Sequence, residues 1–519
     1  MRRIVHEPAF RRSGCRLVAA VLAALVAAAA STSAFASFPQ LSLILPRGAQ
    51  RGGEREFTFR GQRLGDAEEV LFHTAGGIAV KSIQPVDANS FKAVLAIPAE
   101  CPLGEQLVQV RCKSGITEFR SLWVGGLPVV DEVEPNSLFE QPQTVQLDTT
   151  IHGIVTGEDV DLFVVEAKKG QRISVDIEGL RLGSHRFDPH VSIVDMRRFE
   201  LASADDSPAT LQDGILSVII PEDGKYVVQV REASYGGDGE SRYRLHVGTF
   251  PRPAAVYPAG GKAGEKTKVS FIGDASGPIE QEVDVPAITP GLGGNVLQLF
   301  ARDAAGVCPS SLPFRISAAG NALEQEPNND VAAATSADIG LVFNGVIAAP
   351  GDVDHFRFGA KKGQSFDVEC FARRLRTGLD PVVNVLRANG SAVAGNDDSV
   401  GPDSAFRFDV PEDGEYLLRV TDHLGRGRPD FVYRVEFAPP KPAFSLSIPR
   451  IDRYSQTRQT IFVPRGNRFA VLLNASKRNF DGELVLDGSG LPAGITMHAP
   501  RMKQGQNQIP VVFEAAADA

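Results

Sequence analysis

The stretch PEDGKYVVQV at Pro221–Val230 returns 190 residues later as PEDGEYLLRV at Pro411–Val420. Each copy begins with a Glu-Asp-Gly turn signal, in which glycine can adopt the backbone conformation that a hairpin turn requires. Each turn leads into a run rich in valine, leucine and tyrosine, residue types that are favoured in strands. The stretch therefore predicts the same turn and strand at two places in the chain.

Further segments match in the same order, at offsets between 190 and 193 residues. They are EVEPNS at Glu132 and EQEPNN at Glu324, AKKGQ at Ala167 and at Ala360, Asp205-Asp206-Ser207 and Asp397-Asp398-Ser399, and Tyr243-Arg244 and Tyr433-Arg434. The offset changes by only three residues over about a hundred, which indicates one module present twice, with minor loop changes.

Apolar and polar residues alternate in short runs throughout both copies. Ile173, Val175 and Ile177 alternate with Ser174 and Asp176, which is the period of a strand with one buried face. After the N-terminal region the sequence shows no sustained helical periodicity, and glycine and proline are abundant at 51 and 34 residues. We therefore predict an all-β fold of tandem β-sandwich domains, some jelly-roll-like and others immunoglobulin-like.

The N-terminus has the order of a secretory signal peptide. Five arginines precede the apolar run Leu17–Ala30, and the small residues Ala34 and Ala36 follow it. The run is too short to cross a bilayer, which needs about 20 apolar residues. We therefore predict a signal peptide at 1–36 and a secreted, periplasmic or cell-surface protein whose mature chain has no transmembrane segment.

The repeat divides the rest of the chain. We predict an immunoglobulin-like domain at 37–127, the first repeated sandwich at 128–250, a second immunoglobulin-like domain at 251–319, and the second repeated sandwich at 320–438. Residues 439–519 form a third immunoglobulin-like segment, which ends soon after Val511-Val512-Phe513 and so has little chain left for a closing strand. We expect this last domain to be minimal or truncated, or the sequence to be a fragment.

The charge balance disfavours a nucleic-acid partner. The predicted signal peptide holds five of the 54 Lys and Arg and one of the 63 Asp and Glu, so its removal shifts the net charge from −9 to −13. Binding to phosphates needs clustered Lys and Arg, and no such cluster is evident.

Three recurring motifs carry a family resemblance. They are the E-x-E-P-N openings (Glu132, Glu134, Pro135, Asn136; Glu324, Glu326, Pro327, Asn328), the D-x-D-x-F segments (Asp159, Asp161, Phe163; Asp352, Asp354, Phe356), and a Gly-x-Tyr strand (Gly224, Tyr226; Gly414, Tyr416). The repeated module resembles the bacterial pre-peptidase C-terminal (PPC) domain, a β-sandwich found beside secreted peptidases and in the collagen-binding part of bacterial collagenases. The segments 37–127 and 251–319 resemble immunoglobulin-like domains of the IPT/TIG type, and 439–519 resembles a bacterial immunoglobulin-like domain.

The resemblance implies a calcium site in each copy. Carried over residue by residue, the ligands are Glu132, Glu134, Asn136, Asp159 and Asp161 in the first copy, and Glu324, Glu326, Asn328, Asn329, Asp352 and Asp354 in the second. Calcium binds six to eight oxygen atoms in irregular geometry, and alternate residues of an extended segment can face one ion. The first copy departs from the pattern with Ser137 in place of Asn329. The alternative is that the openings are solvated linkers and that Asp161 and Asp354 cap turns.

The sequence contains no recognisable catalytic motif. It has no H-E-x-x-H, G-x-S-x-G or phosphate-binding glycine loop. His185, Asp188 and His190 form a dense polar cluster, but the second copy has Thr377, Asp380 and Val383 in that region, so we interpret the cluster as a surface loop. We therefore predict that the chain is not an enzyme.

Four cysteines follow the signal peptide: Cys101, Cys112, Cys308 and Cys370. Only Cys101 and Cys112 are close enough in sequence to suggest a disulfide, and the alternative is that each cysteine is a small buried hydrophobe. Cys370 corresponds to Ile177 in the first copy, which favours the second interpretation there.

Two functions remain open. The first is a noncatalytic exported protein whose sandwiches bind a protein or an extracellular polymer, or act as spacers. The second is the accessory region of a secreted peptidase or other hydrolase whose catalytic domain lies outside this sequence.

Overall fold

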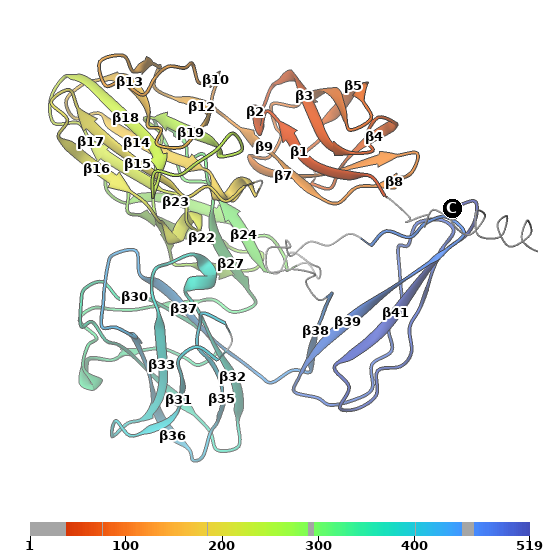
Figure 1. The fold of residues 1–519 in the computed structure, drawn as a ribbon. Helices are drawn as coiled ribbons and strands as arrows, with labels where there is room; N and C mark the ends of the chain where they lie inside the picture. The colour runs from red at the N-terminus through yellow and green to blue at the C-terminus, as the bar shows by residue number, and fades with distance from the viewer. Residues whose placement is uncertain (1–37, 75, 184, 289–294, 400, 449–460) are drawn as a thin grey trace, which may run out of the picture.

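The computed structural model describes residues 38–74, 76–183, 185–288, 295–399, 401–448 and 461–519 (Figure 1). These residues form strands and no α-helix; the only helical elements are four short 3-10 turns, η1 (Leu180–Leu182), η2 (Pro208–Thr210), η3 (Val331–Ala333) and η4 (Arg373–Leu375). The predicted all-β class is confirmed. The predicted signal peptide at 1–36 lies outside the described residues.

None of the described segments forms a helix long and apolar enough to cross a membrane.

The first stretch of chain folds into two facing sheets. One has the order β1 (Gln40–Leu45), β3 (Gly53–Gln62), β6 (Ser90–Ile97), β5 (Ala79–Asp87); the other has β2 (Gly48–Gln50), β9 (Arg120–Gly125), β7 (Gly104–Cys112), β4 (Ala67–Phe72), with β8 (Gly115–Ile116) beside β7. Phe57, Phe59 and Phe91 are completely buried between the sheets. We call this unit the first leading sandwich.

The first repeated sandwich follows. One sheet has the order β10 (Val129–Asp131), β12 (Thr149–Ile154), β19 (Arg242–Gly248), β14 (Arg172–Glu178), β17 (Ile215–Ile219); the other has β11 (Gln143–Thr144), β13 (Asp161–Ala167), β18 (Gly224–Glu232), β15 (Pro189–Asp195), β16 (Glu200–Ala204). Residues alternating along β13 and β14, such as Phe163, Val165, Ile173 and Val175, fill its core, as the period-2 pattern predicts.

The second repeated sandwich has the same strand order. One sheet is β28 (Asn321–Leu323), β30 (Val342–Val346), β37 (Val432–Ala438), β32 (Ser365–Phe371), β35 (Ala405–Asp409); the other is β29 (Thr335–Ser336), β31 (Asp354–Ala360), β36 (Gly414–Asp422), β33 (Pro381–Arg387), β34 (Ala392–Asn396). The register is also the same, because Asp161 pairs with Val230 and Asp354 pairs with Val420. The two copies detected in the sequence are therefore the same sandwich.

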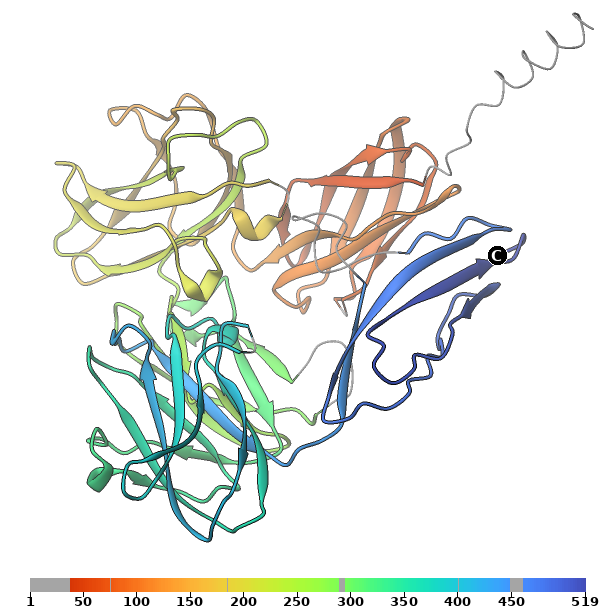
Figure 2. The same ribbon diagram turned by 60° about the horizontal axis from the view of Figure 1, so that its bottom comes forward.

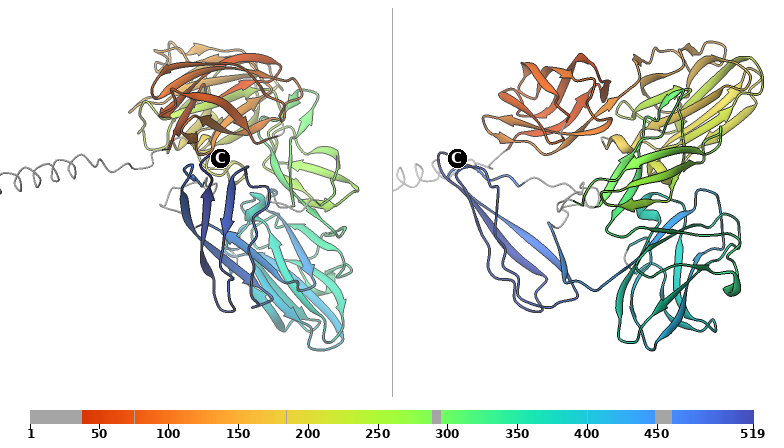
Figure 3. Two further views of the ribbon diagram at one scale, coloured as in Figure 1. Left: turned by 90° about the vertical axis from the view of Figure 1, so that its right-hand side faces the viewer. Right: turned by 180° about the vertical axis from the view of Figure 1, so that it is seen from behind.

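A smaller pair of sheets lies between the repeated sandwiches, as the green strands in Figures 1 and 3 show. One sheet is β20 (Ala255–Tyr257), β22 (Lys266–Ile272), β23 (Ile279–Asp284); the other is β21 (Gly260–Lys262), β27 (Leu312–Ser317), β24 (Val296–Leu299), and β25 (Arg302–Asp303) forms a ribbon with β26 (Gly306–Val307). We call this unit the second leading sandwich, since it precedes the second repeated one.

The last described stretch forms one sheet, visible as the blue layer in Figure 2. Its order is β38 (Ala443–Ser447), β39 (Arg468–Arg478), β41 (Gln508–Ala515), β40 (Ile495–His498). Side chains between residues 484 and 502, including Leu484 and Met502, pack on one face of it. A facing second sheet does not occur among the described residues of this segment.

The cysteines that follow the predicted signal peptide are all free and buried. Cys101 and Cys112 do not form a disulfide; both lie in the core of the first leading sandwich. Cys370 pairs with Val435 where Ile177 pairs with Leu245, so the thiol occupies a position that the other copy fills with isoleucine. The buried-hydrophobe interpretation therefore describes these cysteines.

Candidate metal centres

A short edge strand delivers the acidic opening to each repeated sandwich. β10 runs parallel to β12, and the Glu132 amide continues the ladder by donating to the His152 carbonyl at 2.9 Å. In the second copy β28 runs parallel to β30, and the Glu324 amide donates to the Asn344 carbonyl at 3.0 Å. The openings are thus bound to the sandwich and are not free linkers.

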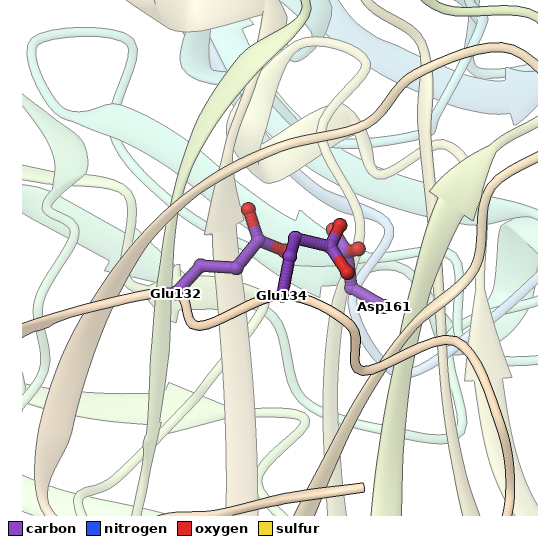
Figure 4. Close-up of side chains that lie close together, drawn as sticks. All are labelled: Glu132, Glu134 and Asp161. Carbon is purple, nitrogen blue, oxygen red and sulfur yellow. The ribbon is translucent and has the colours of Figure 1, made fainter.

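Three carboxylates converge in the first copy. Oxygen atoms of Glu132, Glu134 and Asp161 lie within 4.8 Å of one another, and Figure 4 shows the three side chains pointing toward one another. Glu132 and Glu134 come from the opening segment, whereas Asp161 is the first residue of β13 and is completely buried. We call this group the first acidic triad.

Backbone and side-chain donors hold the first triad in place. One Glu132 oxygen, Oε2, accepts from the Ile154 amide at 2.9 Å, and Oε1 accepts from Asn136 Nδ2 at 3.1 Å. The Tyr243 hydroxyl donates to Asp161 Oδ2 at 2.7 Å and lies 3.3 Å from Glu132 Oε1. One buried tyrosine therefore connects the opening segment to the body of the sandwich.

The second acidic triad, Glu324, Glu326 and Asp354, repeats this arrangement with oxygen atoms within 4.8 Å of one another. The Tyr433 hydroxyl donates to Asp354 Oδ2 at 2.6 Å, and the Val346 amide donates to Glu324 Oε1 at 2.9 Å.

Glycine makes room for the tyrosine in both copies. Gly153 pairs with Tyr243 across the sheet, and Gly345 pairs with Tyr433. A Cβ atom added to either glycine would lie 2.3 Å from the tyrosine hydroxyl oxygen, which no real contact permits. The triad thus depends on residues of β12 and β19, or β30 and β37, that the sequence motifs did not include.

Each triad and its neighbouring asparagine contain buried oxygen atoms that accept no hydrogen bond from the described residues. In the first copy these are Asp161 Oδ1 and Asn136 Oδ1, and in the second Asp354 Oδ1, Glu324 Oε2 and Asn328 Oδ1 lack a donor among the described residues. A buried polar atom without a partner is costly, by about 1–3 kcal/mol. A shared proton or a bound cation can satisfy such atoms. All the atoms that could coordinate a cation here are oxygens.

The electrostatics of the triads favour a positive charge at these positions. Burial raises the pKa of Glu132 and Asp161, and repulsion from Glu132 raises that of Asp161 further. Burial also raises the pKa of Glu324 and Asp354, with the charge of Asp354 adding to the rise for Glu324. Without a cation, each triad therefore favours keeping a proton among its carboxyl groups. Both buried acidic clusters can hold a metal ion.

Asp159, Asp352 and Asn329, also predicted as ligands, accept hydrogen bonds outside the triads. Asp159 accepts from the Ser137 hydroxyl at 2.7 Å, Asp352 accepts from the Ala348 amide at 2.8 Å, and Asn329 accepts from the Val353 amide at 2.7 Å. Ser137 connects the first opening segment to the loop before β13, and Asn329 connects the second to the loop before β31. The two residues that differ between the copies at this position therefore make equivalent contacts. Asp161 and Asp354, by contrast, accept from a tyrosine on a distant strand and do not cap a turn.

The histidine cluster does not converge. His185 lies 3.4 Å from the Asp238 carboxylate, on another loop, and both side chains are substantially exposed. His190 belongs to strand β15, so the three residues do not share one surface loop.

The chain was compared with known proteins. No protein-family model matches it. A stretch of 99 residues, 18% of the chain, is 35% identical to a probable subtilase-type serine protease of Deinococcus radiodurans, and it spans 14% of the length of that curated relative.

Several solved structures align with parts of the chain at low scores. The pre-peptidase C-terminal domain of a Bacillus anthracis collagenase aligns over 99% of its own length and 22% of this chain, with 18% identity and a TM-score of 0.17. PliG, a periplasmic lysozyme inhibitor of Aeromonas hydrophila, aligns over 98% of its length and 23% of this chain, with 19% identity and a TM-score of 0.17. The protein SGBP-B of Bacteroides ovatus, solved with a mixed-linkage heptasaccharide, aligns over 74% of its length and 77% of this chain, with 8% identity and a TM-score of 0.16.

The repeated pairs of sheets make this chain a tandem β-sandwich protein. A short part of its sequence is similar to a subtilase-type protease.

Proposed function

We propose that each repeated sandwich binds one Ca²⁺ at its acidic triad, and that the chain is a noncatalytic exported protein whose sandwiches bind other molecules or act as spacers. The observation that carries the proposal is the recurrence of the triad. The same carboxylates, the same tyrosine donor and buried oxygen atoms without a donor occur in both copies.

The chemistry of the donors favours calcium over other common metals. Zinc sites usually include cysteine or histidine, and neither residue type belongs to the triads. Magnesium requires a near-octahedral arrangement and usually keeps several waters, whereas calcium accepts many oxygen ligands in irregular geometry. Carboxylates and a neighbouring amide on an irregular segment suit calcium best.

The expected role of the ion is to fasten the opening segment. Glu132 and Glu134 belong to that segment, whereas Asp161 belongs to β13, so a cation shared by them joins two parts of the sandwich. In its absence the carboxylates repel one another unless a proton stays with them. Calcium bound only by the folded state stabilises that state through mass action.

Thermal unfolding of the mature chain with calcium and with a chelator tests the proposal. At a hundred times the dissociation constant a single site adds about 2.7 kcal/mol, so the melting temperature should rise clearly in calcium. The double variant Asp161→Asn with Asp354→Asn should lose this rise. The matched control Asp223→Asn with Asp413→Asn, which removes one carboxylate from the Glu-Asp-Gly turn of each copy, should keep it. Coincident melts of the wild type at millimolar calcium and in chelator would reject the calcium sites.

A second function is favoured by one specific observation. The 99-residue similarity to a probable subtilase-type serine protease fits an accessory region of a secreted peptidase. The reading frame downstream of codon 519 discriminates the two: a catalytic domain there supports the accessory role, whereas a stop codon or further sandwich repeats support a protein without catalytic activity.

A further inference from the structure

The Tyr-Arg pair that recurs in the sequence has two separate roles. Adjacent residues of a strand point to opposite faces of the sheet, so Tyr243 and Tyr433 enter the sandwich while Arg244 and Arg434 leave it. These arginines are nevertheless fully buried, with side chains 1% and 0% exposed. Something outside the repeated sandwich must therefore cover each of them.

In the first half of the chain the cover is the first leading sandwich. A Cβ atom on Gly48 would lie 2.9 Å from Arg244 Cζ, and one on Gly125 would lie 3.1 Å from Arg244 Nη2, so the guanidinium occupies space that only glycine leaves free. Across the same interface Arg47 Nη2 donates to the Leu182 carbonyl at 2.6 Å. Within its own module Arg244 pairs with Glu178.

In the second half the same position is covered by the second leading sandwich. A Cβ atom on Gly260 would lie 2.8 Å from Arg434 Cζ and 2.9 Å from Nε. Arg434 Nη2 donates to the Ser317 hydroxyl of β27 at 2.5 Å, and Arg315 of the same strand forms an ion pair with Glu436 at 2.7 Å. Ala255 and Ala259 share a buried apolar cluster with Phe371, Leu375 and Val432 across this interface.

The two leading sandwiches present their glycine in the same way. Gly48 follows Pro46, and Gly260 follows Pro258, 212 residues later. Gly48 pairs in parallel with Trp123, and Gly260 pairs in parallel with Arg315. The strand before each proline pairs antiparallel with the next long strand, β1 with β3 and β20 with β22.

The partners of the arginine differ between the halves, but its position does not. Phe371 stands where the first copy has Glu178, and Glu436 stands where it has His246. Arg315 stacks on the Phe371 ring at 3.6 Å, a contact with no counterpart at Glu178. The retained feature is thus the arginine seated against a glycine of the preceding sandwich.

We infer that the repeating unit of this chain is a pair of sandwiches, and that Arg244 and Arg434 are the residues that lock each repeated sandwich onto its leading sandwich as one rigid body. A guanidinium is a planar fork of five donors, so its partners fix direction as well as distance. A tilt of the second pair would separate Arg434 from Ser317 on the leading sandwich. Arg244 keeps its partners Glu178 and His152 within its own module, so its contact with Gly48 and Gly125 is steric. Domains of one chain usually move relative to each other unless their interface is well packed, and here both interfaces are filled.

Distance measurements between spin labels on the full chain test the inference. One label is placed on Glu280 of β23 and the other on Glu415 of β36, two exposed strand residues on the two sandwiches of the second pair. The wild type should give a single narrow distance in calcium and in chelator alike, because the lock does not involve the triads. A broad wild-type distribution in both conditions would overturn the inference without any variant.

Variants then assign the lock to the arginine. Arg434→Met should broaden the distribution about twofold or more, and Arg434→Lys should fall between it and the wild type because an ammonium lacks the fork. The control Arg387→Met removes an exposed arginine of the same module, which pairs with Glu412, and should leave the distribution narrow. If Arg434→Met does not fold, Ser317→Ala removes the acceptor on the leading sandwich instead. An unchanged narrow distribution in the folded Arg434 variant, or in Ser317→Ala when that variant replaces it, would contradict the assignment.

Discussion

At the scale of single residues, two buried tyrosines decide how the acidic triads are built. Tyr243 reaches Asp161 across 82 residues of sequence, and Tyr433 reaches Asp354 across 79. Burial raises the pKa of both phenols well above the usual value, with the nearby carboxylates adding to the shift, so each hydroxyl remains a donor.

Removing one hydroxyl tests this role. Tyr433→Phe keeps the ring but leaves Asp354 with a buried oxygen that has lost its donor, which should cost about 1–3 kcal/mol in unfolding free energy. The calcium-induced rise in melting temperature should also change. The control Tyr416→Phe removes a hydroxyl that donates to the Glu412 carbonyl at 2.8 Å and should leave the calcium effect intact. If calcium raised the melting temperature of Tyr433→Phe and Tyr416→Phe equally, Tyr433 would not be part of the site.

A glycine substitution disturbs the second acidic triad by steric means. In Gly345→Ala the new methyl group would lie 2.3 Å from both the Tyr433 hydroxyl and Glu324 Oε2, so the second triad cannot keep its geometry. We expect about half of the calcium-induced stabilisation to be lost, because one of two equivalent sites is affected. Gly359→Ala on β31 meets no atom within 4 Å and serves as the control. Melting curves with calcium and with chelator measure the difference.

The triads also predict a pH dependence in chelator. The folded-state pKa values of Asp161 and Glu324 are raised, so these groups contribute stability below the ordinary carboxyl pKa and lose it as pH rises through the raised value. The calcium-free wild type should therefore lose stability between about pH 5 and about pH 8, relative to the Asp161→Asn, Asp354→Asn double variant. Denaturant titrations at the two pH values measure this. If the unfolding free energies of the two proteins changed with pH in the same way, the raised pKa values of these carboxyl groups would be contradicted.

At the scale of strands, the sequence predicts the repeated elements well because their pattern is local. The alternation along Ile173–Ile177 is a property of neighbouring residues, and so are the turns at Gly170 and Gly363, where both glycines adopt a positive φ. Gly224 and Gly414 do not, since they already belong to the strands that follow the turn.

The sequence does not reveal which side chains meet across strands. Tyr243 reaches the triad because β12 lies between β10 and β19, and this order brings together residues that no local pattern connects. The motifs included Asp159 and Asp352, which instead accept hydrogen bonds in the loops that precede β13 and β31. The recurrence of Tyr-Arg was the available signal for both the triad and the interface, but repetition alone does not say what a residue contacts.

At the scale of the whole molecule, buried ion pairs join the first repeated sandwich to the second leading one. Arg172 pairs with Asp274 at 2.9 Å, and Arg252 pairs with Asp176 at 2.8 Å, with all four side chains at most 6% exposed. Ala209 of η2 also packs into the core of the second leading sandwich. Each described unit between residues 38 and 438 thus has buried contacts with the next one along the chain. The right-hand view of Figure 3 shows these units next to one another.

Breaking one of these pairs should be costly. Asp274→Ala leaves the buried Arg172 with Asp303 and the Thr249 carbonyl as partners and removes the acceptor of the Arg252 amide. The loss of a buried partner typically destabilises by about 1–3 kcal/mol. Glu282→Ala, which removes the exposed partner of Lys266, should leave the unfolding free energy nearly unchanged. Chemical denaturation of the full chain compares the two. Similar small effects would mean that this junction contributes little to the rigidity of the molecule.

One module occurs twice in this chain, and we propose that each copy holds one calcium ion in its acidic triad. Calorimetric titration of the mature, metal-free chain with calcium counts these sites. We expect two sites per chain in the wild type, one after Asp354→Asn and none after the further change Asp161→Asn. Absence of binding in the wild type, or a number of sites that these substitutions leave unchanged, would contradict it.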